Sequence, residues 1–394
     1  MDFRLTEEQE ATRKEMFDVC QELNKKRPRG FAGLNFAYDT GEGWKFHRYC
    51  AEEFVKRGWL ALNWPEEYGG KGTMMDRVFF AEARGYYDIP GVDGFGVGML
   101  APTLIAAASE EIKRQFLPPI AAAEVTWCEL WSEPNAGSDL AAVGTTAIKK
   151  GDEYIINGQK IWTSGAHNAD WGFGLFKTDP QGAKRHNLSF LLLDMKTPGI
   201  TLNPILYMTG EHTYNEIFFD DVHVPARQIV GAENEGWKVT QLLASFERSN
   251  INNIMTLQSQ LKELVQYCNE TEVGGELLAK NPAIRDKLAE IACELEADRV
   301  LAYRIADLQN RNQMTGFNAA MVKVLTGELT ERLALLGTEI LGPFGQVKFS
   351  NWAPQEGVWP SEYQHCFTES ISMGTDEIQK NIMAWYGLGL PKSY

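Results

Sequence analysis

Two segments combine hydroxyl side chains, small residues and a tryptophan in a pattern that suits a large planar ligand. The first, Ser132–Asp139, places Ser132 and Ser138 beside residues that turn the backbone and keep its N–H groups free. The second ends in Trp162-Thr-Ser164. An indole can cover the face of a heterocycle while a nearby hydroxyl reaches a ring heteroatom. The alternative interpretation is a surface β-hairpin whose tryptophan belongs to the core.

Glu247 is a candidate general base. It follows an apolar helix face that includes Val239, Leu243 and Phe246, and a carboxyl group against such a face has a raised pKa that suits proton abstraction. The alternative is an exposed charge pair with Arg248, which for an isolated Glu-Arg dipeptide is the commoner situation.

Gly374-Thr375 stands just ahead of another helix pattern. The free N–H groups and the hydroxyl at such a helix start favour a pyrophosphate or an oxyanion.

Other motifs are weaker. Gly96–Ala101 fits the spacing of a dinucleotide fingerprint, but a loop containing Pro90 precedes it where a strand is required. Close helix packing or room for a ligand explains its glycines better. The six histidines have no metal-ligand spacing, so no metal site is expected.

Composition narrows the class of protein. With 394 residues the chain is expected to form two or three subdomains, and its net charge of −15 argues against nucleic acid or an anionic membrane as partner. Six scattered cysteines favour reduced thiols in a reducing compartment. Neither a signal peptide nor a membrane-length apolar run is recognisable. These features predict a cytoplasmic enzyme.

The elements expected to position the candidate residues change in type along the chain. Apolar spacing predicts helices over 5–27, 43–57, 74–87, 100–108 and 110–122, the last interrupted by Pro118-Pro119. Short apolar runs between turn residues predict antiparallel strands from 125 to about 230. Long amphipathic segments return at 238–268, 283–310, 316–341 and 362–386. The predicted fold is α+β: an N-terminal helical domain (1–123), a central antiparallel β domain (124–232) and a C-terminal four-helix bundle (233–394).

Taken together, these motifs resemble the acyl-CoA dehydrogenase family over nearly the whole chain. The motifs that carry the resemblance are Ser132–Asp139, Asn157–Lys160 with Trp162, Asp221–Pro225, and Gly374-Thr375 with Glu377-Ile378. The resemblance implies the same three-domain order, bound FAD, and oxidation of an acyl-CoA thioester to the trans-2-enoyl-CoA. It also implies that electrons pass to an electron-transferring flavoprotein.

Site residues follow from the resemblance by matching position. It implies that the isoalloxazine is held by Glu129, Leu130, Trp131 and Ser132, with Ser138 near both flavin and thioester, and with Trp162, Thr163 and Ser164 along the ring and its N5 edge. It further implies that Thr375 and Glu377 touch the ADP half of FAD, and that Arg248, Met373 and Gly374 contact the substrate.

The resemblance also decides between the two interpretations of Glu247. Family members often carry the catalytic Glu immediately before Gly-Thr, where this chain has Met373, which cannot accept a proton. The family's other place for the base is the Glu of a Glu-Arg pair in the first bundle helix, and this chain has Glu247-Arg248 there. The implied reaction is removal of the α-proton by Glu247 and transfer of the β-hydride to flavin N5.

Two departures from the family predict a heteromer. Homo-oligomeric relatives carry Arg-x-x-Phe-Gly, whose Arg reaches the neighbouring subunit's FAD pyrophosphate, where this chain has Glu270–Gly274. An acidic residue repels a pyrophosphate. The family's later Gln and Gly-Gly pair is replaced by Glu339–Pro343. A paralogous subunit in an α2β2 heterotetramer would supply the missing groups; a homotetramer is the alternative.

The acyl group is predicted to be bulky. Heterotetramers of this kind resemble enzymes of steroid side-chain CoA esters, and the glycines at 94, 96 and 98 leave room for a ring system. Two rival functions use the same fold: an acyl-CoA oxidase, and a non-catalytic structural subunit of a heteromeric acyl-CoA dehydrogenase.

Overall fold

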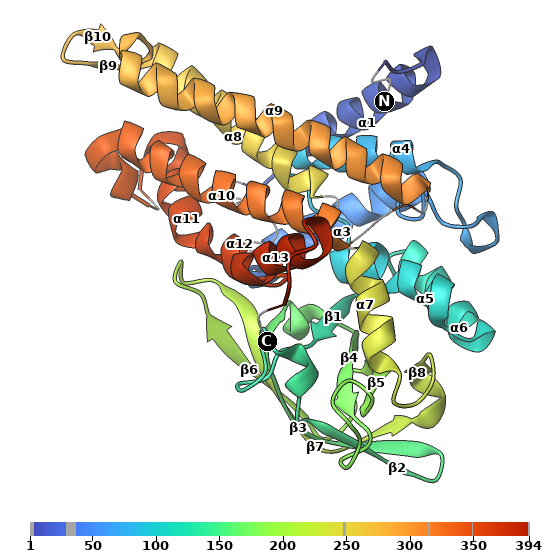
Figure 1. Cartoon of the computed structure of the whole chain (residues 1–394). Helices are drawn as coiled ribbons and strands as arrows, with labels where there is room; N and C mark the ends of the chain where they lie inside the picture. Colours follow the sequence, from blue (N-terminus) through green and yellow to red (C-terminus); the bar gives the residue numbers. More distant parts are fainter. Residues whose placement is uncertain are drawn as a thin grey trace. The chain divides into compact units, whose positions relative to one another are not determined.

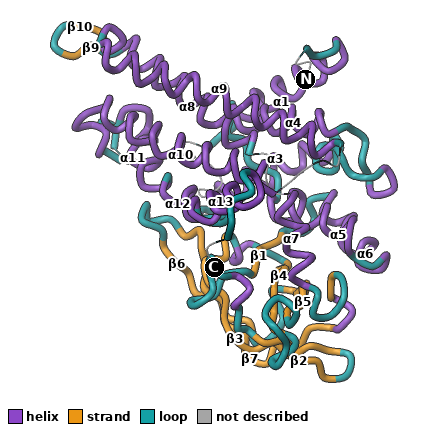
Figure 2. The backbone as a smooth tube through the Cα atoms, viewed as in Figure 1, coloured by secondary structure: helices purple, strands orange, loops and turns teal. Residues whose placement is uncertain are grey.

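The computed structural model describes residues 4–28, 37–246, 250–311, 313, 316–348 and 350–392. The chain divides into two units, each built from segments that are separate in sequence (Figure 1). The helical unit comprises Met1–Ala32, Thr73–Ile89 and Arg248–Tyr394, and the sheet unit comprises Gly33–Gly72 and Pro90–Glu247. Apart from one short hairpin, all the described strands lie in the sheet unit (Figure 2).

Three long helices form the centre of the helical unit. They are α8 (Ile251–Glu270), α9 (Pro282–Asn310) and α10 (Gly316–Leu341), which lie side by side (Figure 1). Leucines and isoleucines at helical spacing bury one core between them. The other elements of this unit are α1 (Glu7–Asn24), α4 (Met74–Tyr86), the hairpin β9 (Glu272–Val273) with β10 (Glu276–Leu277), α11 (Val358–His365), α12 (Phe367–Ile371) and α13 (Asp376–Ile382).

A buried carboxylate joins three of these helices. Glu82 on α4 is fully buried and pairs with Arg13 on α1 at 2.8 Å and with Arg299 on α9 at 3.4 Å. A buried charge needs such partners because its desolvation is otherwise uncompensated. The ion pairs therefore fix α1 and α4 against the bundle.

The fourth bundle helix predicted over 362–386 is broken in the structure. Met373 and Gly374 adopt φ angles of 54° and 79°, which end the helical path between α12 and α13. The segment predicted as one helix over 238–268 is also divided, into α7 (Gly236–Phe246) and α8. Asn250 before α8 has a φ of 44°, which a continuous helix does not allow.

An eight-stranded sheet organises the other unit. Its order is β6-β7-β3-β2-β4-β5-β8, and β1 pairs with β4. Most neighbours are antiparallel as predicted, but β1 and β2 both run parallel to β4. The strands are β1 (Trp127–Leu130), β2 (Thr146–Lys150), β3 (Glu153–Ser164), β4 (Trp171–Lys177), β5 (Leu188–Asp194), β6 (Ile200–Leu206), β7 (His212–Pro225) and β8 (Ile229–Val230).

The middle of the sheet is covered on both faces. On β5, Phe190 and Leu192 pack with the unit's helices, whereas Leu191 and Leu193 pack into a core among the strands. This alternation follows from the two-residue period of a strand. The helices of this unit are α3 (Gly41–Lys56), a π-helical turn (Gly94–Leu100), α5 (Ala101–Ala107), α6 (Glu110–Ala121) and α7. The predicted interruption of α6 at its two prolines is wrong, because the helix runs through them to Ala121.

Two glycines of α10 give a matched test of packing. A β-carbon at Gly337 would overlap the ring of Trp359, which is 1% exposed and cannot move aside. A β-carbon at Gly327 would meet no atom closer than 3.5 Å. We expect Gly337→Ala to lower the free energy of unfolding by about 2 kcal/mol. Gly327→Ala should raise it by up to about 1 kcal/mol, because alanine favours helix. Urea unfolding of both variants checks this; equal effects would contradict it.

Candidate active site

The structure brings together the first two groups of predicted site residues within the sheet unit. Glu129 and Leu130 end β1, with Trp131 and Ser132 following, and the backbone N–H of Ile161 on β3 donates to the carbonyl of Ser132 at 2.9 Å. The end of β1 and the Trp162–Ser164 end of β3 are therefore neighbours. Ser138 lies in the loop that follows β1 and is exposed.

Trp162 occupies a bulge in β3. Lys160 pairs with Ile217 and Thr163 with Asn215, so two residues of β3 oppose one of β7, and Trp162 has a φ of 62°. Such bulges redirect a side chain, and the left-handed backbone is strained for an aromatic residue. Its indole is 57% exposed, so Trp162 is not a core residue.

The residues around Trp162 fit the FAD that the resemblance implies. Tyr214 meets the indole edge-on, with ring centroids 6.1 Å apart and an interplanar angle of 83°, which leaves the indole available to a flat ligand. Two positions on, the Ser164 hydroxyl is only half-buried. Between them, the Thr163 hydroxyl is buried and has no hydrogen-bond partner in the described part of the chain. An exposed indole next to hydroxyl groups that can still form hydrogen bonds suits a planar heterocycle with polar edges.

A buried lysine anchors the loop after β1. Lys160 is fully buried, and its Nζ donates to Glu133 Oε1 at 2.8 Å and to the carbonyl of Trp131 at 3.1 Å. Glu133 in turn accepts the backbone N–H groups of Gly144 (2.6 Å) and Thr145 (3.0 Å). The ion pair thus ties both ends of the predicted isoalloxazine loop to β3.

Burial and pairing shift the pKa values of both Lys160 and Glu133. Burial lowers the pKa of Lys160 to about 8, although Glu133 partly offsets the shift. Burial alone would raise the pKa of Glu133, but Lys160 and the backbone donors hold it below its usual value. Lys160 was not among the predicted site residues. It is an even number of residues from the buried Tyr154 and Ile156, and this two-residue period of the strand is the signal that could have placed it on the inner face.

The third group of predicted residues lies in the helical unit, at the start of α13. The Thr375 hydroxyl caps this helix by accepting the N–H of Ile378 at 3.3 Å. The Gln379 side chain donates to the carbonyl of Met373 at 2.7 Å, which holds the left-handed turn of Met373-Gly374. Glu377 is exposed, and hydrogen bonds from its own backbone N–H and from Thr375 lower its pKa. A capped helix start of this kind fits the pyrophosphate end of a dinucleotide.

Glu247 and Arg248, the predicted base and the predicted CoA contact, lie outside the described residues. Their assigned roles remain predictions.

The glycines predicted to widen the acyl pocket differ from one another. A β-carbon at Gly96 would lie 2.5 Å from Asp93 Oδ2 and 2.8 Å from Trp127, so this glycine is required for close packing. At Gly94 and Gly98 no atom lies within 4 Å. Of the three glycines, only Gly94 and Gly98 therefore leave space for a bulky acyl group. They lie in a π-helical turn, a feature that is frequent at functional sites.

Two acidic residues that depart from the family pattern lie on the helical unit. Glu270 is the exposed last residue of α8, where its Oε1 accepts from Gln266 Nε2 at 2.9 Å, and Glu339 on α10 pairs with Lys287 on α9 at 2.7 Å. The end of α8 therefore carries a carboxylate where the pattern has a cation.

Comparison with known proteins gives a consistent result along the whole chain. Sequence models of the acyl-CoA dehydrogenase N-terminal, middle and C-terminal domains match residues 6–124, 128–222 and 234–386. The acyl-CoA dehydrogenase IpdE1 of Mycobacterium tuberculosis is 35% identical, over 89% of this chain and 90% of its own. The chain belongs to the acyl-CoA dehydrogenase family. The predicted fold and enzyme class are thereby confirmed, and the family is one of flavin-dependent oxidoreductases.

Other similarities of this acyl-CoA dehydrogenase are equally extensive. FadE26 of the same bacterium is 31% identical over 98% of both chains. Among solved structures, a chain of the ChsE4-ChsE5 complex from Mycobacterium tuberculosis superimposes with a TM-score of 0.88 at 30% identity, with complete coverage of both chains. A chain of the Tcur3481-Tcur3483 steroid acyl-CoA dehydrogenase also gives 0.88, at 26% identity. In the described part of this chain, no helix is both long and apolar enough to span a bilayer.

Proposed function

We propose that this acyl-CoA dehydrogenase uses FAD to convert a bulky acyl-CoA thioester, of the steroid side-chain class, to its trans-2-enoyl-CoA. Two observations together carry the proposal. The family models match nearly the whole chain, and Trp162 is exposed, with a strained backbone, beside the end of β1. One of the two similar structures, Tcur3481-Tcur3483, is a steroid acyl-CoA dehydrogenase, which supports the substrate class. The open space at Gly94 and Gly98 agrees with it.

The residues assigned to the cofactor are those that the family resemblance indicates. Glu129, Leu130, Trp131 and Ser132, together with Ser138, Trp162, Thr163 and Ser164, would hold the isoalloxazine, and Thr375 and Glu377 would hold the ADP half. When bound, FAD supplies the hydride acceptor.

The chain's own residues supply orientation and proton transfer. Arg248 binds CoA, and the backbone N–H of Met373, with Gly374 beside it, donates to the thioester carbonyl, which stabilises negative charge as the α-proton leaves. Glu247 takes that proton. Trp162 and the Lys160-anchored loop exclude water from the reacting carbons, which strengthens each of these interactions.

The assembly that we propose is a heterotetramer with a paralogous subunit. The acidic Glu270 at the exposed end of α8 supports this, because a carboxylate opposes binding of a neighbour's pyrophosphate. Both similar structures are named as complexes of two different chains. The proposed electron acceptor is an electron-transferring flavoprotein.

Anaerobic titration tests the proposal. The purified chain, alone and with the paralogue encoded beside it, is mixed with a panel of CoA esters from short branched acyls to sterol side chains. The expected result is bleaching of the flavin absorbance by the bulky esters, with full FAD occupancy only in the mixed complex. Full occupancy in a soluble homotetramer would overturn the heteromer. Rapid reoxidation by dissolved oxygen would assign an acyl-CoA oxidase, and absence of bleaching a structural subunit.

A further inference from the structure

The side chain of Asn215 on β7 is fully hydrogen-bonded, and one of its partners is the backbone next to Trp162. It is 1% exposed, and its Nδ2 donates to the carbonyl of Thr163 at 3.1 Å and to Nδ1 of His167 at 3.1 Å. Its Oδ1 accepts from Nε2 of His212 at 2.9 Å. Both amide hydrogens and the carbonyl are therefore engaged, which fixes the orientation of the amide.

The two histidines hold this amide through a defined tautomer. Nε2 of His167 lies 2.9 Å from the carbonyl of Tyr38, so it carries the proton, and the lone pair of Nδ1 accepts from Asn215. The His167 and His212 rings are stacked, with centroids 3.9 Å apart and planes at 22°. This arrangement requires a neutral His167.

Protonation of His167 would break the arrangement. An Nδ1–H group would face the Nδ2–H of Asn215, donor against donor. The charged and titratable groups around the ring are His212 from β7 and Tyr38 and Asp39 from the segment before α3; Asp39 is occupied by the backbone N–H of His212 at 2.9 Å. Burial lowers the pKa of His167, and His212 lowers it further. The neutral form therefore persists to a pH below the ordinary pKa of a histidine, although Asp39 and the hydrogen bonds to Tyr38 and Asn215 partly offset the shift.

The strained backbone of Trp162 needs support on both sides. On one side, the N–H of Ile161 is bound to Ser132. On the other, Asn215 holds the carbonyl of Thr163. A left-handed aromatic residue costs about 1–3 kcal/mol and persists only where its surroundings fix it. Loss of one support lets the backbone relax and moves the indole.

We propose that Asn215, oriented by neutral His167 and by His212, is the positioning residue that holds Trp162–Ser164 in the conformation that binds FAD. The inference rests on the proposed function, since it assigns the segment to the flavin site. Its consequence is that FAD binding weakens when His167 takes a proton.

The test measures the dissociation constant for FAD by flavin fluorescence at several pH values, in the full chain with its partner subunit present. In the unaltered protein, the affinity should fall about tenfold as the pH falls through the pKa of His167, the effect expected for one lost buried hydrogen bond. Asn215→Ala should bind FAD about tenfold more weakly at neutral pH, with a much smaller pH effect. The His167→Gln variant should retain the affinity for FAD, because the glutamine amide can both donate and accept a hydrogen bond. It should lose the pH effect, because that amide does not titrate.

His223→Gln is the matched control. His223 lies on the same strand, is exposed and pairs with Glu153 at 2.8 Å, so its replacement should leave both the affinity and the pH effect unchanged. Hydrogen exchange of residues 161–166 in the FAD-free protein should be faster in Asn215→Ala and unchanged in His167→Gln.

The outcomes separate this inference from the proposed function. If Asn215→Ala fails to fold, the pH effect in His167→Gln still decides. A pH effect that persists in His167→Gln, or wild-type affinity in Asn215→Ala, would overturn the positioning role while leaving the dehydrogenase assignment intact. Absence of FAD binding by the unaltered complex would instead overturn the proposed function, and this inference with it.

Discussion

The Glu247→Gln variant is expected to keep its FAD, but acyl-CoA should reduce that FAD roughly a thousandfold more slowly than in the wild type. A positioned general base usually contributes a factor of this size to the rate. Glutamine has the shape of glutamate but cannot accept the α-proton. Met373, which occupies the family's other position for the base, offers only a thioether. Stopped-flow measurement of anaerobic flavin reduction, with FAD content determined from the absorbance spectrum, checks both parts of the prediction.

The control is the carboxylate that most closely precedes Met373 in the sequence. Glu369 on α12 lies four residues before it, and burial raises the pKa of Glu369, which makes it the obvious competing base. Glu369→Gln should leave the reduction rate within about threefold of the wild-type rate, since an uninvolved carboxyl contributes no proton transfer. If Glu369→Gln abolishes reduction and Glu247→Gln does not, the base must be reassigned to α12.

Local signals in the sequence predicted several of the helices well. Thr6 and Gln9 have the three-residue spacing of a capping box, and both hydrogen bonds of that box are present at the start of α1. The helix predicted over 316–341 matches α10. Such features depend on neighbours three or four residues apart, which the sequence displays directly.

Features set by tertiary context were missed. The break between α12 and α13 depends on a left-handed methionine that Gln379 holds in place, and nothing in the type of Met373 indicates that conformation. The exposure of Trp162 depends on a bulge defined by the partner strand β7. The sequence identified these residues as candidates, but only the strand register shows how Trp162 is presented to a ligand.

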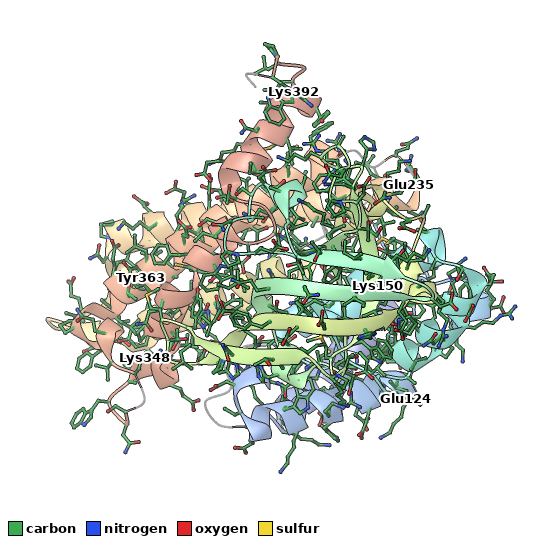
Figure 3. The ribbon with its side chains drawn as sticks, turned by 90° about the horizontal axis from the view of Figure 1, so that it is seen from below. Glu124, Lys150, Glu235, Lys348, Tyr363 and Lys392 are labelled. Atoms are coloured by element: carbon green, nitrogen blue, oxygen red, sulfur yellow. The ribbon has the colours of Figure 1, made fainter. Side chains whose placement is uncertain are left out.

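Lys160→Met should strongly destabilise the sheet unit while leaving the candidate ligand-contacting residues unchanged. Methionine fills a similar volume but leaves Glu133, with a side chain 10% exposed, without its cation. Removing one partner of a buried ion pair costs about 3–5 kcal/mol. Urea unfolding followed by tryptophan fluorescence measures the change. Lys150→Met is the control: Lys150 ends β2 with an exposed side chain, as Figure 3 shows, and its replacement should change stability by less than about 0.5 kcal/mol.

The pH dependence of unfolding separates the charge of Lys160 from its packing. Burial lowers the pKa of Lys160 to about 8, below the value of 10.5 in the unfolded chain. Between these two pH values the unfolded chain binds more protons than the folded one, so the contribution of this residue to stability rises with pH across that window. The rise should disappear in Lys160→Met and persist in Lys150→Met. The double variant Lys160→Met/Glu133→Gln should recover part of the lost stability, because it removes the uncompensated charge. If the double variant is as unstable as the sum of the single variants, the ion pair does not anchor the loop after β1, and the packing of the lysine stem does.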